Sequence, residues 1–357
     1  MADDPNPDVL RIAQVAPVIF PVPPRGSGGT ERVVHDLTEA LVAHGHSVTL
    51  FAPEDSRSSA PLVSAGPSLS ALERLYGKVA PGVPAALEAM QLDLLRERLD
   101  SFDIIHCHGE FAHAAVLGEA RPRSITTVHW RLDERDRQLF FGHFRDLPVA
   151  AISASQARAL PPANLAGIVH HGIARDRYAM GTGAGGYLAF IGRMTDQKRP
   201  DRAIAIAHRA GMPLRLAGAV DVGNPDYFAK HVAPARGERI VHVGELDDPA
   251  KQDLLGNAVA LVFPIDWPEP FGLVMIEAMA CGTPVIAWDN GSVREIIEPG
   301  VTGYVVSSEA EAAAAVAYAA ELDRATIRRR FEARFTADRM AHDYVALYRA
   351  QLARAAR

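Results

Sequence analysis

Two glutamates bracket an otherwise apolar stretch of the chain, PEPFGLVMIEA, at residues 268–278. They are Glu269 and Glu277. Proline is well suited to the first turn of a helix, because its missing N–H has no intrahelical role there. The sequence therefore predicts a helix that begins near Pro270 or Phe271 and carries Glu277 about one and a half turns inside.

The start of this predicted helix has the chemistry of a site for phosphates and hydroxyl groups. Free N–H groups around Gly272 and Leu273 favour an anion, and Gly272 lets a ligand approach the backbone. Helical side chains lean toward the N-terminus, so Glu277 is expected to reach the same end, with Glu269 in the loop outside. An ionised carboxylate accepts two hydrogen bonds, which suits a vicinal diol. We therefore expect a nucleotide sugar.

The alternative is a buried helix whose acid only stabilises the helix dipole. That explains Glu269 alone, because Glu277 would remain a buried charge without a partner.

The elements that could position these residues are short runs of β-branched residues that alternate with amphipathic helices. This pattern is typical of parallel sheets covered by helices on both faces. A first series has a helix expected from about Thr30, as its N-cap, to Gly45, as its C-terminal stop, and a loop near residues 81–84. Its expected strands are at residues 11–16, 47–52, 102–108, 124–130 and 149–153.

A second series follows a glycine-rich segment at 172–186, which is expected to be an interdomain linker. Its helix is expected at 199–210. Its expected strands are at residues 187–193, 213–218, 239–244, 258–264 and 284–288.

Two Rossmann-like α/β domains are therefore predicted, with ligands in a cleft beyond the carboxyl ends of the strands. The N-terminal, acceptor-side domain comprises residues 1–172 with about 338–357, and the donor domain comprises residues 173–337. The last helix, at 336–355, is expected to return to the first domain. Its apolar residues at helical spacing are Met340, Tyr344, Leu347 and Tyr348.

Two cations, Arg193 and Lys198, follow the carboxyl end of the strand expected at 187–193, where they could balance a diphosphate. The alternative for them is a surface pair beside a turn. No Asp-x-Asp motif occurs in the chain, so no metal is expected to hold the leaving diphosphate.

In the first domain, Gly28 and Gly29 lie in a loop before the first helix and could approach a phosphate or form a flexible turn. This loop lacks GxGxxG spacing, which disfavours an NAD-dependent dehydrogenase. Glu31 could reach an acceptor or only favour the helix dipole.

His106 and His108 occupy alternate positions at a strand end, so only one of them is predicted to face the cleft. His108 with Glu110 is a candidate acceptor-side pair. A metal site is disfavoured, because no third ligand is evident.

The composition limits the partners. A net charge of −6 without long runs of one sign does not indicate nucleic acid as a partner.

Two cysteines are too few for a disulfide framework and suit a reducing cytosol. No segment reaches the roughly 20 apolar residues of a membrane span, so the protein is expected to be cytoplasmic. The arginine-rich C-terminus indicates a solvated helix face or, at most, peripheral membrane contact.

Several ordered blocks resemble the retaining GT-B glycosyltransferases of family 4. They are EPFGLVMIEAMACGTPVIA, GGTERVVHDLTEALVAHGHSVTLFA, IGRMTDQKRPDRAI and GSVREIIEPGVTGYVV. Together the blocks cover nearly the whole chain. Departures from the common pattern are Arg199 and Pro200, where a glycine is frequent, and His171 and Ala174, where Asn and Asp are frequent.

The resemblance implies a role for each matching residue. Glu277 would bind the ribose, and Glu269 with the amides of Phe271, Gly272 and Leu273 would hold the sugar hydroxyls. Arg193 and Lys198 would hold the diphosphate, with Gly28 and Gly29 opposite, and His129 would contact donor sugar and phosphate. Base contacts would come from Val243, Gly244 and Leu246.

The expected function is metal-independent transfer of a hexose from a nucleotide-diphosphate sugar, of the UDP-glucose type, to a hydroxyl acceptor with retention of configuration. The acceptor could be a sugar, a lipid-linked group or a small molecule. Alternatives are a nucleotide-sugar epimerase of the same fold and a non-catalytic nucleotide-sugar-binding protein.

Overall fold

A computed structural model describes residues 8–26 and 28–357. The acidic residues 1–7 and Ser27 of the glycine loop lie outside the described residues. The chain forms two compact units. The N-terminal unit runs up to Gly172 and includes Ala337–Arg357, and the C-terminal unit is Ile173–Thr336.

The described part of the N-terminal unit is built on a seven-stranded parallel sheet with the order β3-β2-β1-β4-β5-β6-β7. Its strands are β1 (Arg11–Val15), β2 (Ser47–Phe51), β3 (Leu62–Val63), β4 (Ile104–Cys107), β5 (Ser124–Thr127), β6 (Val149–Ala151) and β7 (Leu165–Ile168). β1 pairs with both β2 and β4. The chain therefore adds β2 and β3 on one side of β1 and the strands from β4 onward on the other side, so the order of strand addition reverses between β1 and β4.

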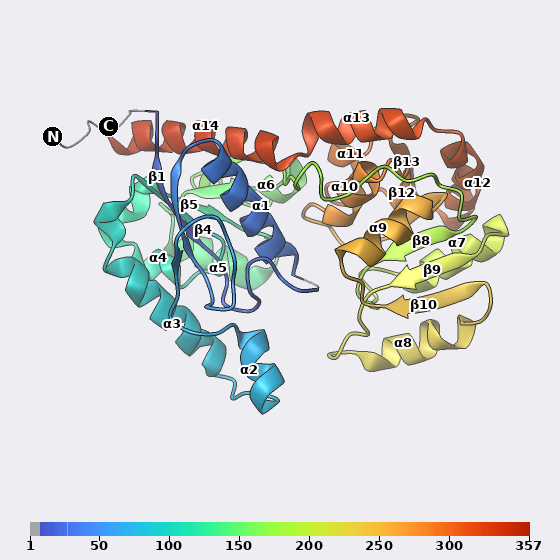
Figure 1. The fold of residues 1–357 in the computed structure, drawn as a ribbon, viewed down its shortest axis with the longest axis horizontal. Helices are drawn as coiled ribbons and strands as arrows, with labels where there is room; N and C mark the ends of the chain where they lie inside the picture. Colours follow the sequence, from blue (N-terminus) through green and yellow to red (C-terminus); the bar gives the residue numbers. More distant parts are fainter. Residues whose placement is uncertain (1–7, 27) are drawn as a thin grey trace. The chain divides into compact units, whose positions relative to one another are not determined.

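Helices cover this sheet on both faces, as parallel strands require. They are α1 (Gly29–Ala43), α2 (Leu69–Tyr76), α3 (Val83–Arg96), α4 (His113–Val116), α5 (Arg135–His143), α6 (Ala154–Ala157) and α14 (Ala337–Ala355), with the 3₁₀ helices η1 (Leu99–Ser101) and η2 (Gly118–Arg123). The last helix, α14, packs beside α1 (Figure 1). It buries Met340, Tyr344 and Tyr348.

The C-terminal unit is built on a six-stranded parallel sheet with the order β10-β9-β8-β11-β12-β13. Its strands are β8 (Leu188–Ile191), β9 (Leu214–Ala217), β10 (Ile240–Gly244), β11 (Ala260–Phe263), β12 (Val285–Trp288) and β13 (Gly303–Val306). Its helices are α7 (Pro200–Ala210), α8 (Pro225–His231), α9 (Asp248–Asn257), α10 (Leu273–Ala280), α11 (Val293–Ile296), α12 (Glu309–Ala320) and α13 (Arg324–Arg334), with the 3₁₀ helix η3 (Ala233–Ala235).

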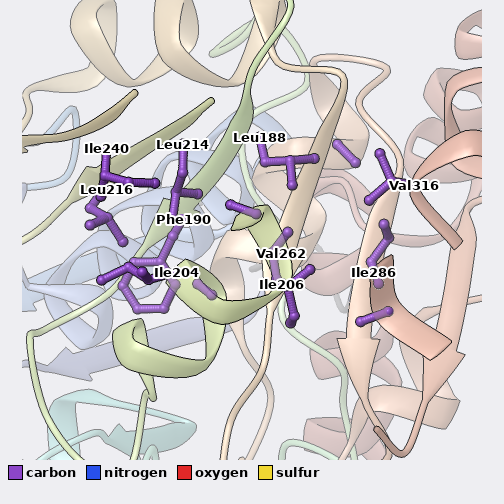
Figure 2. Close-up of a cluster of buried hydrophobic side chains, with 14 of the residues drawn as sticks. Leu188, Phe190, Ile204, Ile206, Leu214, Leu216, Ile240, Val262, Ile286 and Val316 are labelled. Atoms are coloured by element: carbon purple, nitrogen blue, oxygen red, sulfur yellow. The ribbon is translucent and has the colours of Figure 1, made fainter. Parts of the chain in front are cut away.

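One face of this sheet packs against α7 and α12 through branched side chains. Figure 2 shows Phe190 and Leu216 from the strands meeting Ile204 from α7, with Val316 from α12 near Ile286. Burial of such side chains supplies about 1.5–3 kcal/mol each. This core fixes the strands whose carboxyl ends lead into the candidate site.

The prediction of two Rossmann-like α/β series is confirmed, but two local expectations are wrong. Thr30 is not a helix N-cap, because Gly28 occupies that position and α1 begins at Gly29. The proline-rich patch at 81–84 is only partly a loop, since α3 begins at Val83 and takes Pro84 into its first turn. A proline there removes no intrahelical hydrogen bond.

The segment at 172–186 contains no helix or strand, yet it is not a free tether. The N–H of Gly181 donates to the Cys281 carbonyl at 2.9 Å, and that of Gly183 donates to the Gly256 carbonyl at 2.9 Å. A Cβ on Gly181 would lie 2.1 Å from the Gly256 oxygen. The glycines therefore permit close backbone packing along the C-terminal unit.

Arg324 joins this segment to the sheet. Its guanidinium donates to the carbonyls of Gly181, Gly256, Ala258 and Cys281 and to the Thr283 hydroxyl. Because Arg324→Ala removes these five hydrogen bonds, we predict a loss of at least about 3 kcal/mol in free energy of unfolding. Urea denaturation checks this. Arg329→Ala, on the exposed face of the same helix, is the control and should stay within about 0.5 kcal/mol of wild type. Equal effects of the two variants would contradict the assignment.

Candidate functional site

The carboxyl ends of β8 and β11 lie side by side in the sheet of the C-terminal unit. The chain leaves β8 toward β9 and β10, and it leaves β11 in the opposite direction, so this is the reversal point of the sheet. Ligands of open α/β sheets bind at such points. Lys198 lies in the segment after β8, and Glu269 lies in the segment after β11.

The structure brings Glu269 and Lys198 together as an ion pair. Glu269 is 7% exposed, and its Oε2 also accepts a hydrogen bond of 2.9 Å from the Trp267 indole N–H. The ammonium of Lys198 lies 4.7 Å from the centre of the Trp267 ring, which adds a cation–π contact. Both polar contacts fall on Oε2, so Oε1 has no partner among the described residues.

The loop that carries Glu269 is fixed by the segment before α11. Ser292 donates its N–H to the Glu269 carbonyl at 3.0 Å and its hydroxyl to the Phe271 carbonyl at 2.7 Å. A Cβ on Gly291 would lie 2.3 Å from the backbone nitrogen of Glu269, so only glycine fits there. Gly291 and Ser292 are positioning residues that the sequence analysis missed, because nothing local links them to residues 269–271.

The helix after Glu269 begins later than predicted. α10 starts at Leu273 with Gly272 as its N-cap, so Pro270 lies outside the helix. Gly272 has φ of +83°, and a Cβ there would lie 2.7 Å from the Met275 methyl group. The chain turns at this glycine because a side chain would be strained and crowded. Phe271 is buried, and Leu273 is partly buried.

Glu277 is 3% exposed on α10 and forms an ion pair of 2.8 Å with Lys251 on α9. The objection raised against the purely structural alternative, that Glu277 would be a buried charge without a partner, is therefore wrong. Lys251 contacts Oε1, as does the Tyr178 hydroxyl at 3.5 Å, while Oε2 has no partner within the described part of the chain. The sequence gives no signal for Lys251, because it pairs with an acid 26 positions away on another helix.

The remaining predicted donor-side residues have fewer contacts. Arg193 is exposed, and its side chain has no partner among the residues the structure describes. It therefore does not pair with Glu269, the acid that Lys198 contacts. Val243 and Gly244 end the edge strand β10, where Val243 is 41% exposed and Gly244 has φ of +78°. Leu246 follows, partly buried. The Gly244 carbonyl accepts a hydrogen bond of 2.8 Å from the Gly218 N–H, and the base contacts expected of these three residues stay a prediction.

In the N-terminal unit, Gly28 caps α1 with φ of +145°, and Gly29 is exposed as the first helical residue. A Cβ on Gly28 would lie 2.7 Å from Pro24 and 3.3 Å from the Glu31 carboxylate. Glu31 is 4% exposed and turns inward under this loop. Burial raises the pKa of Glu31 to about 7, against the lowering effect of N–H groups of Glu31 and Phe20.

His106 and His108 lie on the same side of the N-terminal sheet, with ring centres 4.0 Å apart. The alternation on which the expectation that only one of them faces the cleft was based is therefore wrong. Positions i and i+2 of a strand share a face. His108 Nε2 bonds to Gln14 Oε1 at 2.7 Å, and His106 Nδ1 bonds to the Tyr348 hydroxyl of α14 at 2.6 Å. Burial lowers the pKa of both histidines, so both are neutral.

His129 extends this network toward the end of β5. Its Nε2 lies 3.0 Å from His108 Nδ1, and its ring stacks on His171 at 5.0 Å. Burial lowers the pKa of His129, so its ring is neutral at neutral pH. Both ring nitrogens of His108 are thus engaged inside the unit. Glu110, its predicted acceptor-side companion, is exposed beside a pocket.

No group of three or more His, Cys, Asp or Glu side chains among residues 8–26 and 28–357 is placed to hold a metal ion. No helix in these ranges is both long and apolar enough to cross a membrane.

Comparison with known proteins gives matches in both units. Residues 184–334 match the family described as glycosyl transferases group 1, and residues 27–165 match the one described as glycosyltransferase family 4. The phosphatidyl-myo-inositol mannosyltransferase of Mycobacterium leprae is 26% identical over 91% of this chain and 90% of that protein.

Solved structures share the fold. AviGT4, a glycosyltransferase involved in avilamycin A biosynthesis, superposes with a TM-score of 0.71 at 24% identity, covering 96% of this chain and 98% of that one. HepE of Anabaena, solved in complex with UDP and glucose, superposes with a TM-score of 0.68 at 18% identity, covering 94% and 98%. The chain therefore belongs to the group 1, family 4 glycosyltransferases and has their GT-B fold.

Proposed function

We propose that this glycosyltransferase transfers a hexose from a nucleotide-diphosphate sugar, of the UDP-glucose type, to a hydroxyl acceptor with retention of configuration and without a metal ion. The observation that carries the proposal is a pair of buried carboxylates, Glu269 and Glu277, at the reversal point of the C-terminal sheet, each held by one lysine. Each acid keeps one oxygen without a partner in the described part of the chain.

Glu277 has the geometry of a ribose ligand. Lys251 holds Oε1 and orients the buried carboxylate, so Oε2 can accept a hydroxyl hydrogen bond. The N-cap at Gly272 leaves the first N–H groups of α10 available for a neighbouring anion. A ligand that satisfies both features combines a diol with a phosphate.

The Lys198 and Glu269 pair can exchange partners when such a ligand arrives. The donor diphosphate attracts the Lys198 ammonium, and the Glu269 carboxylate becomes available to the hydroxyl groups of the hexose. Neither charge is left buried and unpaired in either state, which matters because an isolated buried charge is strongly destabilising. Arg193 supplies a second, exposed cation for the diphosphate.

In the transfer step, the bond from the anomeric carbon to the diphosphate oxygen breaks as the acceptor oxygen bonds to that carbon on the same face. The acceptor proton passes to the departing phosphate oxygen. Lys198, Arg193 and the α10 N-terminus stabilise the charge that develops on the diphosphate.

The comparisons support the donor class without fixing the sugar. The Mycobacterium leprae relative is a mannosyltransferase, and HepE was solved with UDP and glucose. Hexoses on nucleotide diphosphates are thus the substrates to test first, and UDP-glucose and GDP-mannose are suitable probes.

Glu277→Gln should weaken donor binding about tenfold or more, because the neutral amide loses charged hydrogen bonds to ribose, each worth about 1.5–3 kcal/mol. It should also lower stability by leaving Lys251 unpaired. Adding Lys251→Met should restore stability but not donor affinity. Calorimetric titration with both probes and thermal unfolding measure the two effects. Wild-type donor affinity in the double variant would show that Glu277 is only structural.

Lys198→Ala should lower turnover roughly a hundredfold at saturating donor, on the scale of one lost oxyanion donor, with a smaller change in donor affinity. Lys230→Ala, an exposed cation of α8 in the same unit, is the matched control and should keep wild-type turnover. EDTA should leave wild-type turnover unchanged, and proton NMR should show a product of retained configuration. Full activity of the Lys198 variant, loss of activity with EDTA or an inverted product would refute this mechanism.

A further inference from the structure

A pocket of about 280 Å³ opens in the N-terminal unit. It lies beyond the carboxyl ends of β1 and β4, the neighbouring strands at which the direction of travel across this sheet reverses. That is the position at which open α/β sheets bind ligands. The volume is at the lower end for small-molecule pockets, so it suits a single ring rather than a long chain.

Part of the pocket lining is apolar. It includes Val18 and Ile19, in the segment after β1, and Leu92 of α3. Gln91 on the same helix donates its side-chain N–H to the Ala16 carbonyl at 2.7 Å, which ties α3 to the end of β1. The C–H face of a sugar ring could cover this apolar lining.

Two carboxylates, Glu88 and Glu110, also line the pocket. An oxygen of Glu88 lies 3.5 Å from where a Cβ on Gly109 would be, next to Glu110 in the chain. Neither acid has an ion pair or a hydrogen bond among the described residues. Burial, and then the charge of Glu110, raise the pKa of Glu88. The side chains that line the pocket include no lysine or arginine.

A second feature of the pocket is His113, which lines it and is 1% exposed. Its Nε2 bonds to the Thr126 hydroxyl at 2.8 Å, but its Nδ1 has no partner in the described part of the chain. Burial lowers the pKa of His113 to about 4, so the ring is neutral and adds no positive charge at neutral pH. Unsatisfied buried polar atoms are rare, and this nitrogen is enclosed by protein atoms.

We propose that this pocket binds the acceptor as one sugar-like ring that offers hydroxyl or amino hydrogens to Glu88 and Glu110 and carries no phosphate. Two carboxylates without a cation attract hydrogen-bond donors and repel a phosphate, whereas the apolar lining takes the ring face. The identification of this ligand as the acceptor rests on the proposed transfer reaction. The preference for a sugar-like ring without a phosphate rests on the pocket alone.

Binding of glucose, glucosamine and glucose 6-phosphate to the full-length protein tests the proposal by saturation-transfer NMR. Glucose or glucosamine should bind, and glucose 6-phosphate should bind at least tenfold more weakly. Tighter binding of glucosamine would identify an amino group as the preferred donor, and equal binding would identify hydroxyl groups. Comparable or tighter binding of the phosphate, or no binding of any of the three sugars, would overturn the proposal.

Variants locate the binding to the pocket. Glu88→Gln should weaken the preferred sugar about tenfold, whereas Glu73→Gln, an exposed acid on α2, should not. Glu110→Lys, at an exposed position that tolerates lysine, should shift preference toward glucose 6-phosphate. Unchanged sugar affinity in both Glu88→Gln and Glu110→Lys would contradict the site. Binding of UDP, followed by thermal shift in the same samples, reports on the donor site separately, so the two proposals fail independently.

Discussion

Burial of two carboxylates beside the reversal point of a parallel sheet is the constraint on which the C-terminal unit depends. Glu269 and Glu277 are each less than a tenth exposed, and a buried charge without a partner would be strongly destabilising. Lys198 and Lys251 resolve this conflict by pairing with one oxygen of each acid. The arrangement is stable without a ligand and still leaves acceptor capacity for one.

The backbone around the two acids is also tightly constrained. Gly272 permits the turn that starts α10, and Gly291 permits the backbone of residue 269 to pass within contact distance. Ser292 then fixes that loop through two hydrogen bonds. A site held by fixed backbone and paired charges needs little reorganisation when charge develops on a leaving group, which is the condition for electrostatic stabilisation of a transition state.

The sequence predicts what local pattern determines. The buried strands and the last helix follow from hydrophobic periodicity, and Glu269 and Glu277 stand out because acids are rare in apolar runs. Lys251, Gly291 and Ser292 could not be found this way, because each meets its partner only through the tertiary fold. The helix start was misplaced because Pro270 fits a first turn as well as the loop before one. The inward turn of Glu31 likewise depends on Phe20, which precedes the loop.

A crystal structure of the full chain with UDP-glucose, or with GDP-mannose if it binds more tightly, tests the central claim most directly. The account predicts a ribose hydroxyl on Oε2 of Glu277 while Lys251 keeps Oε1. It also predicts that the Lys198 ammonium has moved from Glu269 to the diphosphate and that Glu269 contacts hexose hydroxyls. A bound nucleotide sugar that touches neither acid, with both lysine pairs unchanged, would contradict it.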